Sequence, residues 1–228
     1  PAAGHVVTVA ASNVQLNDFR TNASISTAGI EIGTVNNLTI DNVTATGGNI
    51  GIRTGTATVV DGLTILNSQF DGNQYGLYFA QNGAGTGNAN NVQITNTTFK
   101  NNPKKGIYVE KLDNAVFNGI TVNNSGTSGS NHAAGIDINL KYRSYSNIQI
   151  VNSTISNNGI GDPNGGGMLI KARSTGSYAA VPATLNGVVL KGNLVSGNGG
   201  GTYGAGIRIG ESNNSLTGID AGPTNVSI

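Results

Sequence analysis

The sequence predicts an all-β solenoid, a stack of short strands whose pattern returns along the whole chain. Three observations indicate this fold: glycine contributes 35 of the 228 residues, charged residues make up only 10%, and one short apolar frame recurs. The low charge disfavours amphipathic helices, because their exposed faces need Lys, Glu and Arg. A recurring unit that buries its apolar side against its neighbours is typical of solenoids.

The first element of each repeat is a glycine followed by apolar residues on either side of a variable position. Successive copies begin 22 to 39 residues apart, and the surplus residues lie in segments rich in Gly, Ser and Asn, such as QNGAGTGNAN and NNSGTSGSNHA. Short alternating runs of this kind predict strands that point side chains alternately inward and outward. The frame begins at Gly29, Gly51, Gly76, Gly106, Gly135, Gly167 and Gly206.

A second and a third short run follow each glycine frame, so each repeat predicts three strands. The second runs read NVQL, NLTI, GLTI, NVQI, NAVF, NIQI and GVVL, and the third runs include NSQFDGN, NTTFKNN, NSTISNN and GNLVSGN. Two columns of polar residues accompany them, and we expect the Asn side chains to satisfy backbone groups that stacking buries. The first column is Asp18, Asn42, Asn67, Asn96 and Asn152, with Gly119 and Gly192 in the remaining coils; the second is Asn73, Asn102, Asn158 and Asn198.

These patterns cover nearly the whole chain and resemble the right-handed parallel β-helix superfamily, the pectate-lyase-like folds. That superfamily includes polysaccharide lyases, polygalacturonase-type hydrolases, alginate epimerases and phage tailspikes. The resemblance implies a single-stranded right-handed parallel β-helix of about seven or eight coils with three short parallel sheets. We expect one domain over residues 1–228, as part of a longer chain or of an assembly formed by end-to-end or lateral self-association.

The variable positions of the first strand point outward and gather the reactive side chains of the chain. We expect the long loops that follow Ala80, Asn124, Asn158 and Lys171 to wall a groove on this sheet, where the superfamily commonly binds carbohydrate. The outward residues of the second strand carry no charge. Coil by coil, the first outward column is Glu31, Arg53, Tyr78, Tyr108, Asp137, Leu169 and Arg208, and the second is Gly33, Gly55, Ala80, Glu110, Asn139, Lys171 and Gly210.

Two reactions on a uronic acid polymer fit the candidate catalytic residues of this face. For elimination or epimerisation, Lys171 and Arg208 are the candidate cation and base, and Tyr108 is the candidate proton donor. For hydrolysis, Glu110 and Asp137 are the candidate carboxyl pair; strand geometry puts their Cα atoms about 8 Å apart, in the range of an inverting mechanism.

Noncatalytic interpretations of the same face remain open. Alternating charges, with Glu110 beside Lys171 and Asp137 near Arg208, keep an exposed sheet soluble and hinder edge pairing. The aromatic rings serve equally as strand packing or as a platform for a sugar. The basic segment 103–111 is expected to be a solvated turn. The candidate substrate-binding residues are Tyr78, Tyr108, Asn139, Arg53 and His132, the last of which lies in the loop before Asp137.

Motifs of the individual enzymes are missing from the sequence. The segment GDPNGG has the Asp-Pro of the epimerases without their His, and RIG at Arg208 only partly matches the hydrolase motif. No Asp cluster and no GGxGxD repeat is present. We therefore predict no metal site and no cofactor, with calcium as an alternative that no motif supports.

Composition narrows the classes of partner. The net charge is +1 with scattered basic residues, which gives no footprint for nucleic acid or an anionic membrane. No apolar run reaches the roughly 18 residues that cross a bilayer, and the chain has no cysteine for disulfides. The sequence predicts an extracellular or cell-surface domain that binds or modifies acidic polysaccharide as a lyase, hydrolase or epimerase; the alternative is a noncatalytic surface, adhesin or fibre module.

Overall fold

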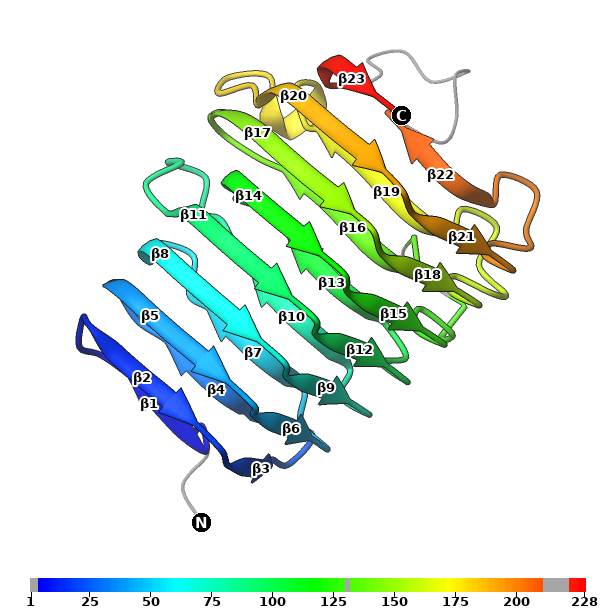
Figure 1. Cartoon of the computed structure of the whole chain (residues 1–228). Coiled ribbons are helices and arrows are strands. Elements are labelled where there is room, and N and C mark those ends of the chain that lie inside the picture. Colours follow the sequence, from blue (N-terminus) through cyan, green and yellow to red (C-terminus); the bar gives the residue numbers. More distant parts are fainter. Residues whose placement is uncertain (1–3, 130–131, 211–221) are drawn as a thin grey trace.

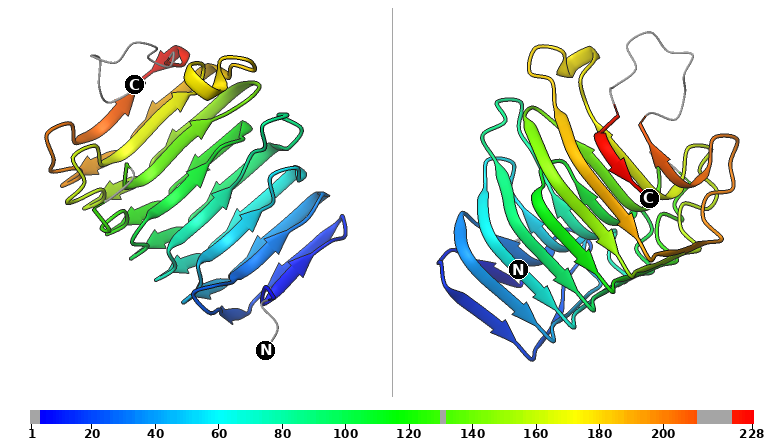
Figure 2. Two further views of the ribbon diagram at one scale, coloured as in Figure 1. Left: turned by 180° about the vertical axis from the view of Figure 1, so that it is seen from behind. Right: turned by 45° about the horizontal axis from the view of Figure 1, so that its top comes forward.

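The computed structural model describes residues 4–129, 132–210 and 222–228, and in it the chain winds into a rod of stacked coils (Figure 1). Each coil adds one strand to each of three sheets, and successive coils pair in parallel. The coils follow one another in sequence order from the N-terminal to the C-terminal end (Figure 2). The predicted all-β solenoid of three parallel sheets is confirmed.

The first sheet carries the outward column of reactive residues. Its strands, in spatial order, are β1 (Val7–Val9), β4 (Ala28–Ile32), β7 (Ile50–Thr54), β10 (Tyr75–Phe79), β13 (Lys105–Val109), β16 (Ala134–Leu140), β19 (Gly166–Ala172) and β22 (Ala205–Ile209).

The second and third sheets complete each coil, and the described residues contain one short 3₁₀ helix, η1 (Gly176–Tyr178), in the loop after β19. The strands of the second sheet are β2 (Val14–Asn17), β5 (Val35–Asp41), β8 (Val59–Leu66), β11 (Asn88–Thr95), β14 (Asp113–Asn118), β17 (Ser144–Val151), β20 (Thr184–Lys191) and β23 (Thr224–Ser227). Those of the third sheet are β3 (Arg20–Asn22), β6 (Thr44–Thr46), β9 (Gln69–Asp71), β12 (Thr98–Lys100), β15 (Thr121–Asn123), β18 (Thr154–Ser156) and β21 (Leu194–Ser196).

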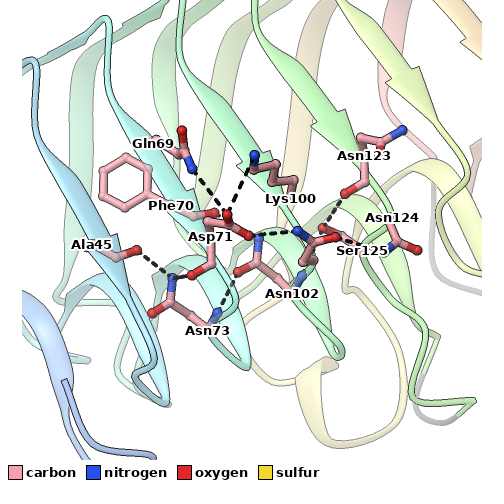
Figure 3. Close-up of polar contacts among 11 residues, drawn as sticks. Ala45, Gln69, Phe70, Asp71, Asn73, Lys100, Asn102, Asn123, Asn124 and Ser125 are labelled. Carbon is pink, nitrogen blue, oxygen red and sulfur yellow. Dashed lines mark hydrogen bonds and ion pairs between the residues drawn. The ribbon is translucent and has the colours of Figure 1, made fainter. Parts of the chain in front are cut away.

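The core is a continuous column of apolar side chains from the inner faces of the three sheets. The two apolar positions of each glycine frame point into it, as Ile30 and Ile32 do in β4 and Ile136 and Ile138 do in β16. Identical positions stack on one another between coils, and the rings of Phe70 and Phe99 lie 5.2 Å apart (Figure 3 labels Phe70). Burial of these stacked rows drives the coils together.

The first polar column is exposed, so it does not satisfy buried backbone groups as the sequence suggested. Asn42 donates to Asp18 at 2.7 Å, but Asn67 donates to Asp41 of the preceding strand instead of to Asn42. All its members have positive φ, between 47° and 67°. These positions hold Asn, Asp or Gly because these residues adopt the left-handed conformation at low cost.

The second polar column is buried and forms the predicted ladder (Figure 3). The side-chain oxygen of Asn102 accepts from the backbone N–H of Asn73 at 3.0 Å, and that of Asn158 accepts from Ser125 at 2.9 Å. Ser125 takes the ladder position in a coil where the sequence has no Asn. Asn198 extends the ladder by accepting from the Asn158 N–H at 2.9 Å. In each of these coils, a side-chain oxygen therefore satisfies a backbone N–H group of the preceding coil, which fixes the turn that leads into the first sheet.

Candidate functional site

The outward column of the first sheet has the register that the sequence predicted. Tyr78 pairs with Tyr108, Tyr108 with Asp137, Asp137 with Leu169, and Leu169 with Arg208. The second outward column also aligns, with Asn139 beside Lys171. Strands β10, β13, β16, β19 and β22 therefore present these side chains on one surface.

A polar pocket of about 350 Å³ opens over β13, β16 and β19. The loops after Asn124 and Asn158 supply part of its wall, as expected from the sequence, and Arg173 lies just beyond the end of β19. Five of the nine predicted site residues line it: Tyr108, His132, Asp137, Asn139 and Lys171. The remaining lining residues are Lys105, Asp162, Asn164 and Arg173.

Asp137 is nearly fully buried, with 1% exposure, so the expectation of an exposed sheet residue was wrong. It points away from the core, as alternation requires, but the pocket walls cover it. Its Oδ2 forms an ion pair with Lys105, whose ammonium also lies 4.2 Å from the ring centroid of Tyr108. The charge alternation in the sequence had pointed to Arg208 as its partner.

Glu110 lies outside the pocket and its carboxylate is fully engaged. Its oxygens accept from the backbone N–H of Gln81 at 2.9 Å and from the Tyr108 hydroxyl at 2.8 Å, and Lys141 forms its ion pair, where the sequence had pointed to Lys171. The two predicted catalytic carboxyl groups thus have different surroundings, since Asp137 faces the pocket and Glu110 does not.

A relay of hydrogen bonds links the pocket to Glu110. The amide nitrogen of Asn139 donates to the Tyr108 hydroxyl at 3.0 Å, and that hydroxyl donates to Glu110. Burial, and next the charge of Glu110, raise the pKa of Tyr108. The phenol therefore stays protonated, and the amide orientation of Asn139 is fixed by the relay.

Three tyrosines form a platform beside the pocket. The ring centroids of Tyr78 and Tyr108 lie 4.9 Å apart, and Tyr75 lies 5.2 Å from Tyr78 and 6.1 Å from Tyr108. Sequence reasoning missed Tyr75 and Lys105, which pair with each other. Both residues stand directly before the glycine of the frame, where other coils carry small residues such as Ala28 or Ala134. A large or charged side chain at this position is the sequence signal that could have identified them.

The loop that carries His132 is held by Asp162, whose oxygens accept from the backbone N–H groups of Ala133 and Asn164, both at 2.8 Å. Burial, and next the charge of Lys171, lower the pKa of His132, so its imidazole is neutral at pH 7. His132 has a φ of 55°, a conformation that few residue types tolerate.

Arg208 and Arg53 do not line the pocket. Arg208 donates to the backbone carbonyls of Tyr203 and Asn164, both at 2.9 Å, so it braces the loops at the pocket wall. Arg53 forms an ion pair with Glu31 at the far end of the column.

The described part of the chain contains no group of three or more His, Cys, Asp or Glu residues placed to hold a metal ion. Within the same residues, no helix is both long and apolar enough to cross a membrane.

Comparison with known proteins identifies the fold and leaves the ligand open. Residues 28–218 match the family model described as right handed beta helix region. No curated protein and no solved structure matches the chain.

Proposed function

The chain belongs to the right-handed beta helix family, and from that premise we propose that it is an extracellular or cell-surface domain that binds acidic polysaccharide. The observation that carries the proposal is the polar pocket on the first sheet, which adjoins a platform of three tyrosines. A polar pocket beside flat aromatic rings suits a sugar, since sugars offer both hydroxyl groups and apolar ring faces.

The charge of the pocket supports an anionic ligand. Among the described lining residues, three side chains are cationic, Lys105, Lys171 and Arg173, and two are carboxylates, Asp137 and Asp162, an excess of one positive charge. Asp162 is occupied by backbone N–H groups. A sugar carboxylate near the side of β19 therefore meets a favourable field.

Binding is better supported than hydrolysis. An inverting pair needs one carboxylate to activate water and one carboxylic acid to protonate the leaving oxygen. Glu110 is 5% exposed and all its contacts are internal, so it does not reach a substrate in the pocket. Of the residues named for elimination, Lys171 and Tyr108 line the cavity, but Arg208 does not, and the Tyr108 hydroxyl already donates to Glu110.

The second candidate is a noncatalytic surface, adhesin or fibre module. The observation that favours it is the buried ladder from Asn73 to Asn198, which stiffens the rod and does not depend on the pocket. A rod of this kind self-associates end to end or laterally. Sedimentation at increasing concentration tests this, because a pocket-centred function does not require assembly.

Binding to a panel of neutral and acidic polysaccharides tests the first proposal, with new reducing ends and ultraviolet absorbance of unsaturated uronates measured in parallel. Lys171→Gln is expected to weaken binding of the acidic glycan about tenfold or more, since a positive charge of the pocket is lost. Lys191→Gln is the matched control: Lys191 is exposed on β20, away from the pocket, and this change should leave binding intact.

Unsaturated products in the wild-type protein would extend the proposal to a lyase, and new reducing ends without that absorbance would indicate a hydrolase. If no glycan binds the wild-type protein, the polysaccharide proposal is wrong and the structural module stands.

A further inference from the structure

Three side chains of the pocket each keep one buried polar atom that has no hydrogen-bond partner among the residues the structure describes. They are His132 Nδ1, Asp137 Oδ1 and Asn139 Oδ1. Asp137 and Asn139 each offer an acceptor oxygen, and the neutral imidazole of His132 offers an acceptor at Nδ1 in its Nε2-protonated tautomer. All three come from β16 or from the loop directly before it, so they form one side of the pocket.

The remaining polar atoms of these groups fix which way the free acceptors face. Lys105 holds Oδ2 of Asp137, which leaves Oδ1 as the acceptor. The relay from Asn139 through Tyr108 to Glu110 holds the Asn139 nitrogen, so its oxygen remains available. A flip of that amide would set its oxygen against a hydroxyl whose proton is already donated to Glu110, and the flip is therefore disfavoured.

Buried acceptors without donors are costly and rare in folded proteins. Three of them on one side of one pocket indicate a ligand that brings the missing donors. Among the donors that sugars offer, hydroxyl and acetamido N–H groups are neutral, and ammonium groups are charged. The charge of the pocket distinguishes the charged donor from the neutral ones: Lys105 already neutralises Asp137, and both oxygens of Asp162 accept from backbone N–H groups, so no described carboxylate of the lining is left to hold a further cation.

We infer that the β16 side of the pocket is a subsite for neutral hydroxyl groups of a sugar ring, and that it excludes amino sugars that carry a free ammonium group. This inference rests on the proposed function and refines it. The sugar presents its hydroxyl edge to His132, Asp137 and Asn139, while a carboxylate on the same or the next ring faces Lys171 on β19 and Arg173 just beyond it.

The test uses two matched series of methyl glycosides: glucose, glucuronic acid and glucosamine, and galactose, galacturonic acid and galactosamine. Ligand-observed NMR titration of the wild-type protein at pH 6, where the amines are protonated, ranks the six. The inference expects the uronic acid to bind best in at least one series, and the amine to bind about tenfold or more weaker than its neutral parent.

A pair of variants at His132 tests the acceptor directly. Glycine and asparagine both adopt the positive φ of position 132 at low cost, but only asparagine keeps an acceptor, on a short side chain. The two variants are therefore His132→Gly and His132→Asn. His132→Gly should weaken binding of the preferred glycoside about threefold to tenfold, and His132→Asn should recover part of it.

An amine that binds as tightly as its parent overturns the inference, as does an unchanged affinity in His132→Gly. The same holds if none of the six glycosides binds. The polysaccharide panel decides the proposed function separately, so the hydroxyl subsite can fail while acidic-glycan binding stands.

Discussion

Lys111 is a single buried charge that organises two turns beside the first sheet. The sequence placed it in a solvated basic turn, but the structure buries it completely. Its ammonium donates to the backbone carbonyls of Gly55 and Thr58, both at 2.7 Å. A Cβ at Gly87, beside that ammonium, would lie 2.3 Å from the backbone carbonyl oxygen of Thr56, so the neighbouring loop needs glycine at this point. Burial lowers the pKa of Lys111 to about 8, and it is still charged at pH 7.

Replacing Lys111 with Met should therefore lower the free energy of unfolding by about 1–3 kcal/mol, since it leaves two half-buried carbonyls without their donor. Chemical denaturation at pH 7 measures this. Lys191→Met, at an exposed position of β20, is the matched control and should change stability by less than about 0.5 kcal/mol. Equal effects of the two changes would contradict the structural role of Lys111.

Asp137 shows what the sequence predicts at residue scale and what it does not. Alternation along β16 places it outward between Ile136 and Ile138, and the structure agrees. Its burial depends on Asp162 and His132, from loops whose path is set by contacts distant in sequence. A period-2 pattern carries no information on such loops. The ion pair with Lys105 was not predicted because Lys105 stands directly before the frame glycine, outside the two outward columns.

At the scale of the strand, the glycine of each frame is required by the stacking of the next coil. A Cβ at Gly76 would lie 2.5 Å from the carbonyl oxygen of Gly106, and one at Gly51 would lie 2.6 Å from that of Gly76. The same clash repeats along the first sheet up to Gly167. The glycines therefore let successive coils approach each other next to the buried Asn ladder. Their recurrence made the fold predictable from the sequence.

Gly76→Ala should destabilise the protein by about 1–3 kcal/mol, because the added methyl forces neighbouring coils apart. Gly206→Ala is the control in the same frame, since its Cβ would meet only a side-chain carbon of Val195 at 3.4 Å. It should be neutral or slightly stabilising, as alanine reduces the entropy of the unfolded chain. A loss of stability at Gly206 equal to that at Gly76 would show that backbone flexibility, not coil spacing, selects glycine.

At the scale of the whole molecule, the coils form a one-dimensional stack in which each strand pairs only with strands of the adjacent coils (Figure 2). This arrangement follows from the repeat, and the repeat is readable from the sequence. The pocket does not follow from the repeat, because loops of unequal length form its walls beside three adjacent strands. Loop lengths vary from coil to coil without a pattern, so the sequence located the face of the site and only some of its walls, among them the loops after Asn124 and Asn158.

The stack also predicts a gradient of local stability along the rod. Strands of the middle coils are mostly buried, as in β13 and β16, whereas β2, β21 and β22 contain no fully buried residue. Coils with fewer buried contacts open at a lower free energy, and each opening exposes the next coil. Hydrogen exchange measured by mass spectrometry should therefore be slowest in peptides from β10 to β16. It should be at least about tenfold faster in β2 and β21, after correction for intrinsic rates. Uniform protection across all coils would contradict this prediction, because it would mean that the rod unfolds only as a whole. The local stability of the pocket coils would then not depend on their central position in the stack.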